Sequence, residues 1–198
     1  MSTTAELVLY FYLPAVCLMY LCAWLIYRRN RANRLRELVP KERNNPYLRL
    51  GALALNAKRS HINAAPPSSL TDPWGVIMEW VNLPAVVTLV AFRDGSASAY
   101  FSTGGALLGG QAYEPIRRAA QHAVGVAAEF QPQMQLTAEF PLPQPGIVVF
   151  YALTDSGVFT TSTFEAGLRS NSHALSKLSQ AMQAIITAYR TTPVASFG

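Results

Sequence analysis

The chain has 198 residues and a formal net charge of +5, which is unevenly distributed. Residues 1–70 carry ten basic and three acidic side chains, whereas residues 71–198 carry six basic and eight acidic ones. Because the second part has a net negative charge, composition argues against a nucleic-acid-binding domain, which would carry its own basic face. The length fits one small domain and an additional segment.

An uncharged apolar stretch covers residues 7–27. As a helix it would be about 31 Å long, enough for a hydrocarbon core of roughly 30 Å. Five arginines that follow could bind lipid headgroups: Arg28, Arg29, Arg31, Arg34 and Arg36. We therefore predict an uncleaved single-pass anchor in the membrane, with the N-terminus outside and the domain in the cytoplasm. The high alanine content suggests a bacterial inner membrane.

Residues 28–71 form a basic juxtamembrane segment and a linker. Apolar positions within 47–58 predict a short amphipathic helix lying on the membrane or on a partner. Residues 63–71 contain two prolines and two serines without an apolar period, which is typical of a linker. Both cysteines, Cys17 and Cys22, lie in the apolar stretch, so the domain has neither a disulfide framework nor a cysteine metal site.

The domain is predicted to cover residues 72–191, followed by a tail over 192–198. Asp72 and Pro73 open a predicted helix whose apolar face is Trp74, Ile77, Met78 and Val81, and Pro84 ends it. The following predicted elements are strands over 85–92 and 97–102, a glycine-rich loop, a helix from 114, strands over 134–140, 147–154 and 158–164, and a helix from about 172 to 189. This order predicts an α/β (α+β sandwich) fold: a five-stranded, largely antiparallel sheet flanked by helices, in the order α-β-β-α-β-β-β-α, behind one N-terminal transmembrane helix.

The helix that begins at residue 114 has apolar positions at the 3.6-residue period, and most of them are small. Such a stripe would let another element approach closely; its members are Ile116, Ala119, Ala120, Ala123, Val124 and Ala127. The strand over 134–140 alternates apolar and polar residues, which indicates a half-exposed strand at a sheet edge. Its polar side carries Gln135, Thr137 and Glu139.

The element order, together with the Asp-Gly hairpin in VVTLVAFRDGSASAYFS (86–102) and the small-residue helix after it, resembles the roadblock/dynein light chain superfamily. The resemblance covers about residues 72–191 and rests on pattern, because that family has no catalytic motif. It implies a small scaffolding domain that dimerises and serves small GTPases or membrane complexes. It also implies that the small-residue helix and the neighbouring edge strand form the dimer surface. Profilin-like, longin-like and PAS-type modules share parts of the layout.

Catalytic and metal-binding motifs are not evident in the sequence. His61, His122 and His173 are scattered without metal-ligand spacing. The loop STGGALLGGQ lacks both the ending of a P-loop and the G-x-G-x-x-G spacing. It is either a structural loop or a contact for a ligand or partner, through Gly104, Gly105, Gly109 and Gly110.

The sequence therefore predicts a non-enzymatic, membrane-anchored scaffolding subunit of a larger membrane-associated complex. No cofactor or nucleic acid is expected. The expected partners are the lipid bilayer and other subunits of the complex, with a second copy of the chain or a small GTPase as further candidates. The alternatives are a membrane-anchored sensor of a small ligand, with a PAS- or profilin-like domain, and a regulator of a small GTPase.

Overall fold

A computed structural model describes residues 19–25, 46–63 and 65–192. The chain divides into two compact units, residues 1–38 and 39–198. In the first, residues 19–25 are helical. Among the described residues no helix is both long and apolar enough to cross a membrane. The predicted transmembrane helix over 7–27 is thus not found as part of the fold, and most of that stretch lies outside the described residues.

The second unit contains one antiparallel sheet of seven strands, in the order β4-β3-β2-β1-β6-β7-β5. Its strands are β1 (Gly75–Asn82), β2 (Ala85–Phe92), β3 (Ala97–Phe101), β4 (Ala106–Leu107), β5 (Gln135–Thr137), β6 (Ile147–Thr154) and β7 (Gly157–Phe164). Its α-helices are α2 (Pro46–Leu55), α3 (Glu114–Phe130), α4 (Glu165–Arg169) and α5 (Ser176–Thr191). Short 3-10 turns cover Arg59–His61, Gly110–Ala112 and Gln131–Gln133.

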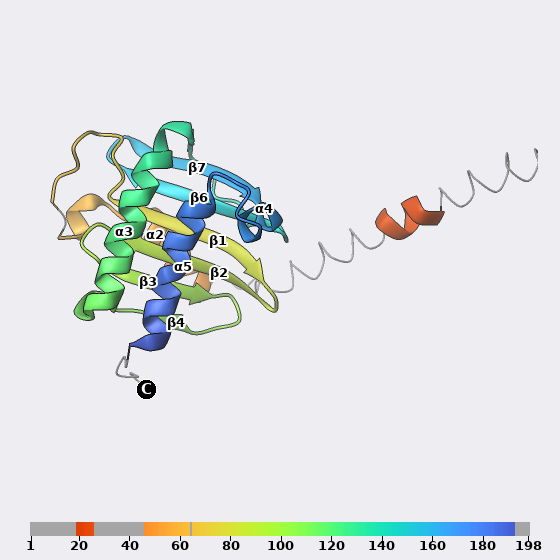
Figure 1. Cartoon of the computed structure of the whole chain (residues 1–198), viewed down its shortest axis with the longest axis horizontal. Coiled ribbons are helices and arrows are strands. Elements are labelled where there is room, and N and C mark those ends of the chain that lie inside the picture. Colours follow the sequence, from red (N-terminus) through yellow and green to blue (C-terminus); the bar gives the residue numbers. More distant parts are fainter. Residues whose placement is uncertain (1–18, 26–45, 64, 193–198) are drawn as a thin grey trace, which may run out of the picture. The chain divides into compact units, whose positions relative to one another are not determined.

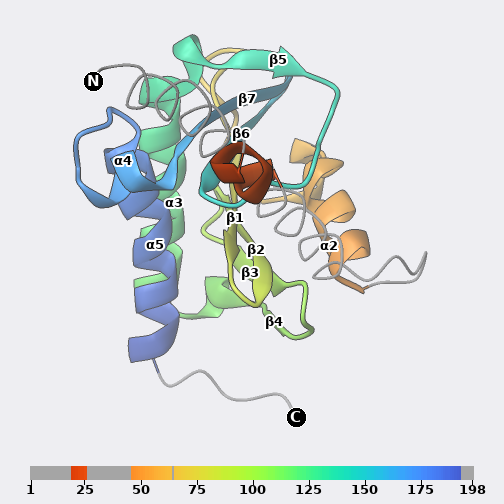
Figure 2. The same ribbon diagram turned by 90° about the vertical axis from the view of Figure 1, so that its right-hand side faces the viewer.

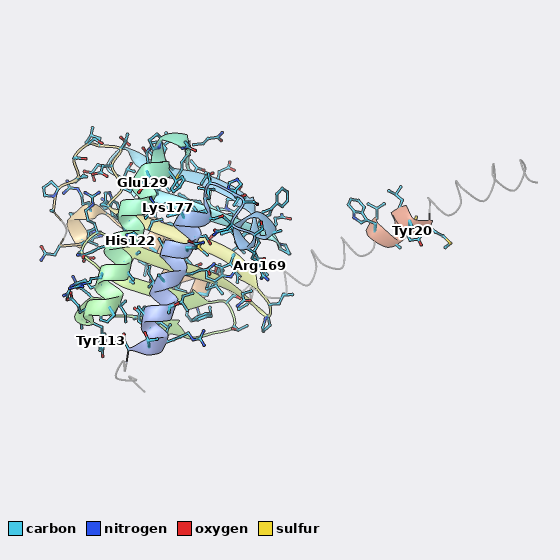
Figure 3. All side chains as sticks on the ribbon, viewed as in Figure 1. Tyr20, Tyr113, His122, Glu129, Arg169 and Lys177 are labelled. Atoms are coloured by element: carbon cyan, nitrogen blue, oxygen red, sulfur yellow. The ribbon has the colours of Figure 1, made fainter. Side chains whose placement is uncertain are left out.

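The helices lie on opposite faces of the sheet. Helices α3 and α5 run side by side across one face (Figure 1). Seen along the sheet, α2 lies on the other side of it (Figure 2). We call the first the inner face and the second the outer face. An exposed ion pair between Lys177 and Glu129, with a shortest N–O distance of 2.6 Å, joins α5 to α3 (Figure 3).

The hydrophobic core lies between the inner face and the helices α3 and α5. Its largest fully buried members include Phe150 of β6, Ile116 of α3 and Met182 of α5. Each such side chain stabilises the fold by about 1.5–3 kcal/mol when it leaves water. The hydroxyl of Tyr189 donates to the carbonyl of Ala97 at 2.8 Å, which ties the end of α5 to β3.

The predicted five-stranded fold was wrong in its strand count and in its first element. The stretch predicted as a helix from residue 72 is the central strand β1, which pairs with β2 on one side and β6 on the other. Both faces of β1 are covered, so its apolar residues do not alternate with polar ones. Some of them therefore fall at the spacing of an apolar helix face, which led to the wrong prediction. Pro84 lies in the turn between β1 and β2, after a cis peptide bond from Leu83.

Other predicted elements agree with the structure. The bounds of β2 and β6 are those expected from their continuous apolar runs. The strand predicted over 134–140 does lie at an edge of the sheet, as β5, but covers only Gln135–Thr137. The two-residue β4, which forms the other edge, comes from within the glycine-rich loop. It has no apolar pattern of its own, which is why sequence reasoning missed it.

Candidate functional site

The small-residue stripe of α3 packs inside the domain. Five of its six residues are at most 1 % exposed: Ile116, Ala120, Ala123, Val124 and Ala127. The sixth, Ala119, is partly buried and packs against the core. Their small size allows α3 to lie close to the sheet and to α5. The helix face predicted to bind a partner is therefore part of the core of this chain.

The polar residues of the predicted edge strand do gather at the surface. Gln135 and Glu139 are exposed and Thr137 is partly buried. They line a groove of about 460 Å³ on the outer face, together with residues of β6 and β7. The groove also contains Tyr151, Thr160, Thr161 and Ser162. The structure thus separates the two halves of the predicted interface, one in the core and one beside β7.

Strand β7 is only partly covered at this edge. It pairs with β6 along its whole length, from Gly157 to Phe164, but with β5 only from Val158 to Thr160. Apart from the helical bonds of α4, whose N-cap is Phe164, no backbone group outside the sheet bonds to residues 161–164 in the described structure. Beyond Thr160, alternate residues of β7 therefore point their backbone donors and acceptors toward an open edge.

The glycine-rich loop serves two structural purposes. Gly104, Gly105 and Gly109 are exposed and have positive φ angles of 104°, 87° and 75°, a conformation that side chains rarely adopt. Gly110 is buried, and a Cβ atom there would lie 2.3 Å from Cγ2 of Ile116 and 2.6 Å from the hydroxyl of Tyr189. The first three shape turns and the fourth permits close packing. A ligand contact at this loop stays a prediction.

A buried polar cluster on the outer face was not foreseen. Glu79 of β1 lies directly opposite Thr88 of β2, and the Thr88 hydroxyl donates to Oε1 of Glu79 at 2.7 Å. The hydroxyl of Tyr47, on α2, lies 2.8 Å from the same Thr88 oxygen. Because Thr88 has a single hydroxyl proton, Tyr47 is the donor in that contact. The hydrogen bonds therefore run from α2 through Thr88 to the carboxyl of Glu79.

The carboxyl of Glu79 lies in an unusual electrostatic setting. The residue is 5 % exposed, and burial raises the pKa of its carboxyl although the hydrogen bond from Thr88 acts in the opposite direction. No ion pair to it is formed within the described ranges. Burial first, and the nearby Glu79 second, also raise the pKa of Tyr47 and of Tyr151. These phenols are therefore neutral at physiological pH.

Phe140 separates two cavities on the outer face. Its ring meets the ring of Tyr151 edge-on, with centroids 5.6 Å apart. Tyr151 lines the groove beside β7, whereas Phe140 and Glu79 line a smaller cavity of about 210 Å³ beneath α2. The hydroxyl of Tyr151 is buried and has no hydrogen-bond partner among the described residues. Polar groups with unused bonding capacity thus lie on both sides of Phe140.

One signal in the sequence could have revealed Glu79. It is the only charged residue in the apolar run VIMEWV, where a carboxylate on a covered strand needs a partner. The hydrogen bonds to it come from Thr88 of β2 and, through Thr88, from Tyr47 of α2. Because Tyr47 lies more than thirty residues before Glu79, sequence spacing does not identify this cluster. The five arginines predicted to contact lipid headgroups lie outside the described residues.

A third depression, of about 520 Å³, lies on the inner face beside α5. Its lining includes Trp80 of β1, Arg169 of α4 and Arg190 of α5. Arg169 forms an ion pair with Glu165, four residues earlier, at 2.6 Å. One of the two arginines that line the depression is therefore already paired.

His122 is exposed on α3 (Figure 3). No group of three potential metal ligands was found in the part of the chain that the structure describes.

Comparison with known proteins adds no relative. No protein-family model, no curated protein and no solved structure matches this chain. The resemblance to the roadblock/dynein light chain superfamily therefore stays a prediction.

Proposed function

We propose that this protein is a membrane-anchored assembly subunit whose domain binds a partner protein along the open edge of β7. The observation that carries the proposal is the mismatch between the eight-residue strand β7 and the three-residue strand β5 that covers it. An added strand from another chain would satisfy the backbone groups that β5 leaves open.

The residues along the open edge support strand addition. Soluble proteins usually protect such edges with charges, prolines or bulges. Residues 161–164 read Thr-Ser-Thr-Phe, without a charge or a proline. Phe164 at the end of the segment is 71 % exposed, and Leu136 on β5 is 65 % exposed. A partner strand would therefore gain both main-chain hydrogen bonds and apolar contacts at the two ends of the edge.

Membrane attachment is proposed from the apolar stretch 7–27 and the arginines after it. The test is a carbonate wash of membranes from cells that express the full chain. We expect the protein to stay with the membranes, and a variant that lacks residues 7–27 to be released. Release of the full chain by the wash would contradict the anchor.

The assembly function is tested by extracting the full-length protein in mild detergent, measuring the native particle mass and identifying its companions. We expect a particle with defined companion proteins. A lone monomer, or a homodimer without companions, would contradict an assembly function.

The β7 edge is tested in the same experiment with Phe164→Glu, which places a charge beside the open backbone groups. The matched control is Leu108→Glu, because Leu108 is 55 % exposed just after β4, at the opposite edge of the sheet. We expect the first variant to lose companions and the second to keep them. If both keep the full particle, or if only Leu108→Glu loses it, the partner does not bind at the edge of β7.

A further inference from the structure

The small cavity beneath α2 has apolar walls and one carboxyl. Its walls come from α2 and from the segment after β5, including Leu48, Ala52, Leu55, Phe140 and Leu142. Glu79 is the only carboxylic acid among its lining residues. Side chains at the mouth are partly open to solvent: Leu48 is 38 % exposed and Leu142 is 43 % exposed. The cavity that Glu79 lines is therefore bordered by side chains that are open to solvent.

Much of the bonding capacity of this carboxyl is unused. An ionised carboxylate offers about four acceptor positions, and the described structure fills one of them, on Oε1, with the hydroxyl of Thr88. Oε2 accepts no hydrogen bond from a described residue. Arg49, Lys58 and Arg59, the basic residues of α2 and of the segment just after it, do not line the cavity. A buried carboxylate without a cation is costly, so the site favours a ligand that brings a positive charge.

We infer that this cavity binds a primary alkylammonium group, with Glu79 as its counterion and the apolar walls around its methylene chain. The inference is independent of the edge of β7. An ammonium has three donors; the Glu79 carboxylate accepts from it, and Asn56, which also lines the cavity, carries a further side-chain acceptor. A guanidinium has five donors in a fixed plane, and the apolar walls would leave several of them unpaired.

The size of the cavity limits the ligand to a short chain. Its volume of about 210 Å³ corresponds to the share of about seven water molecules in the liquid. That is below the usual range for drug-sized ligands, which begins near about 300 Å³. The alkylammonium is therefore either a small free amine or the end of a lysine side chain from a partner. Both use the same chemistry at Glu79.

The test uses the full-length protein in mild detergent and isothermal titration with n-butylammonium chloride. The uncharged probe n-butanol has the same chain and no positive charge. We expect binding of n-butylammonium and none of n-butanol. Binding of the two probes with equal affinity, or no binding of n-butylammonium, would overturn the inference.

Two variants locate the site. Glu79→Gln removes the charge while keeping an acceptor, and we expect it to weaken n-butylammonium binding by about tenfold or more, the loss of one charged hydrogen bond. Glu129→Gln removes an exposed carboxyl of α3, on the inner face, and should bind as the wild type does. Equal binding by Glu79→Gln and the wild type would place the ligand elsewhere.

A further variant covers the case in which Glu79→Gln fails to fold. Ala52→Phe leaves the carboxyl intact and fills the mouth of the cavity from the exposed side of α2. We expect this variant to fold and to lose n-butylammonium binding. Unchanged binding by a folded Ala52→Phe protein would overturn the inference.

The two sources of the amine are distinguished by a second probe, Nα-acetyl-lysine-methylamide, titrated beside n-butylammonium. Tighter binding of the lysine derivative assigns the cavity to a lysine side chain of a partner. Tighter binding of n-butylammonium assigns it to a small free amine. Failure of both probes to bind would overturn the inference and would leave the proposed role of the β7 edge unaffected.

Discussion

The two faces of the sheet are covered in different ways. The inner face lies under α3 and α5, two helices of 17 and 16 residues, and its contacts are apolar and mostly fully buried. The outer face lies partly under the ten-residue α2 and contains Glu79 and Thr88, which are 5 % and 1 % exposed. The inner face thus provides most of the hydrophobic core. The outer face is covered by one short helix and contains polar groups, Glu79 and Tyr151, that could form further hydrogen bonds. This difference is why we place both proposed binding sites on the outer face and at its edge.

The largest effect is expected on the inner face. Phe150→Ala removes a ring that is fully buried between the sheet and the helices. We expect the free energy of unfolding to fall by about 3–5 kcal/mol, as for other deletions of buried aromatic rings. Denaturant unfolding monitored by circular dichroism measures it. A loss of less than about 1 kcal/mol would show that the inner face is not the main core.

Enlarging the small-residue stripe should be the next largest effect. Ala123→Leu adds volume where α3 packs in the core, and overpacking usually costs about 1–3 kcal/mol. We expect lower stability in the same unfolding measurement. If the stripe bound a partner instead, the variant would keep its stability and change the native particle mass.

On the outer face a single hydrogen bond should matter less. Tyr47→Phe removes the hydroxyl that donates to Thr88 and keeps the buried ring. We expect a loss of about 0.5–1.5 kcal/mol, the usual net contribution of one hydrogen bond. Hydrogen exchange of the α2 amides should increase more than exchange in β1. Equal increases in both elements would mean that α2 does not open separately from the sheet.

The buried carboxyl of Glu79 makes the stability of the fold depend on pH. Burial raises the pKa of Glu79 in the folded chain, so the folded state holds a proton that the unfolded chain releases above about pH 4.3. Stability attributable to this protonation is present below the unfolded pKa and is lost as the pH rises through the folded pKa. The phenols that face Glu79, Tyr47 and Tyr151, have raised pKa values and do not titrate in this window.

We therefore expect Glu79→Gln to gain stability relative to the wild type as the pH rises, and to differ least from it in acid. The carboxyl of Asp72 provides the opposite control. Its partial burial raises its pKa, but hydrogen bonds from Ser68 and Arg93 outweigh burial and lower the pKa overall. Asp72→Asn should accordingly lose stability relative to the wild type as the pH rises. Parallel pH profiles for Glu79→Gln and the wild type would contradict the assigned shift.

The sequence predicted the elements whose patterns are unambiguous. Strands β2 and β6 have continuous apolar runs, and α3 has a clear helical period, so local information sufficed. Strand β1 was misassigned because a strand with two covered faces has no alternation to distinguish it from a short buried helix. The partial cover of β7 by β5 depends on which strands pair, which is a property of the whole sheet.

The candidate site was less accessible to prediction than the fold. Gln135, Thr137 and Glu139 were found because alternation placed them on one side of a strand. Glu79 was overlooked because its importance depends on Thr88 and Tyr47, which meet it through sheet pairing and through the docking of α2. The prediction that the α3 stripe binds a partner was wrong, because the stripe is buried in the core of this chain. Small apolar residues allow close packing against any neighbour, so the sequence does not tell a contact within the chain from one with another chain.

The position of β1 has a mechanical consequence. A tension applied from the N-terminal side reaches α2 first, then the segment 56–74, and then β1. The contacts that hold α2 to the sheet include the hydrogen bond from Tyr47 to Thr88. β1 is held along its length by β2 and β6, so it must be pulled out in shear against two rows of hydrogen bonds. Under load we expect α2 to detach while the sheet stays whole, which would widen the cavity at Glu79 and make this face responsive to force on the proposed anchor.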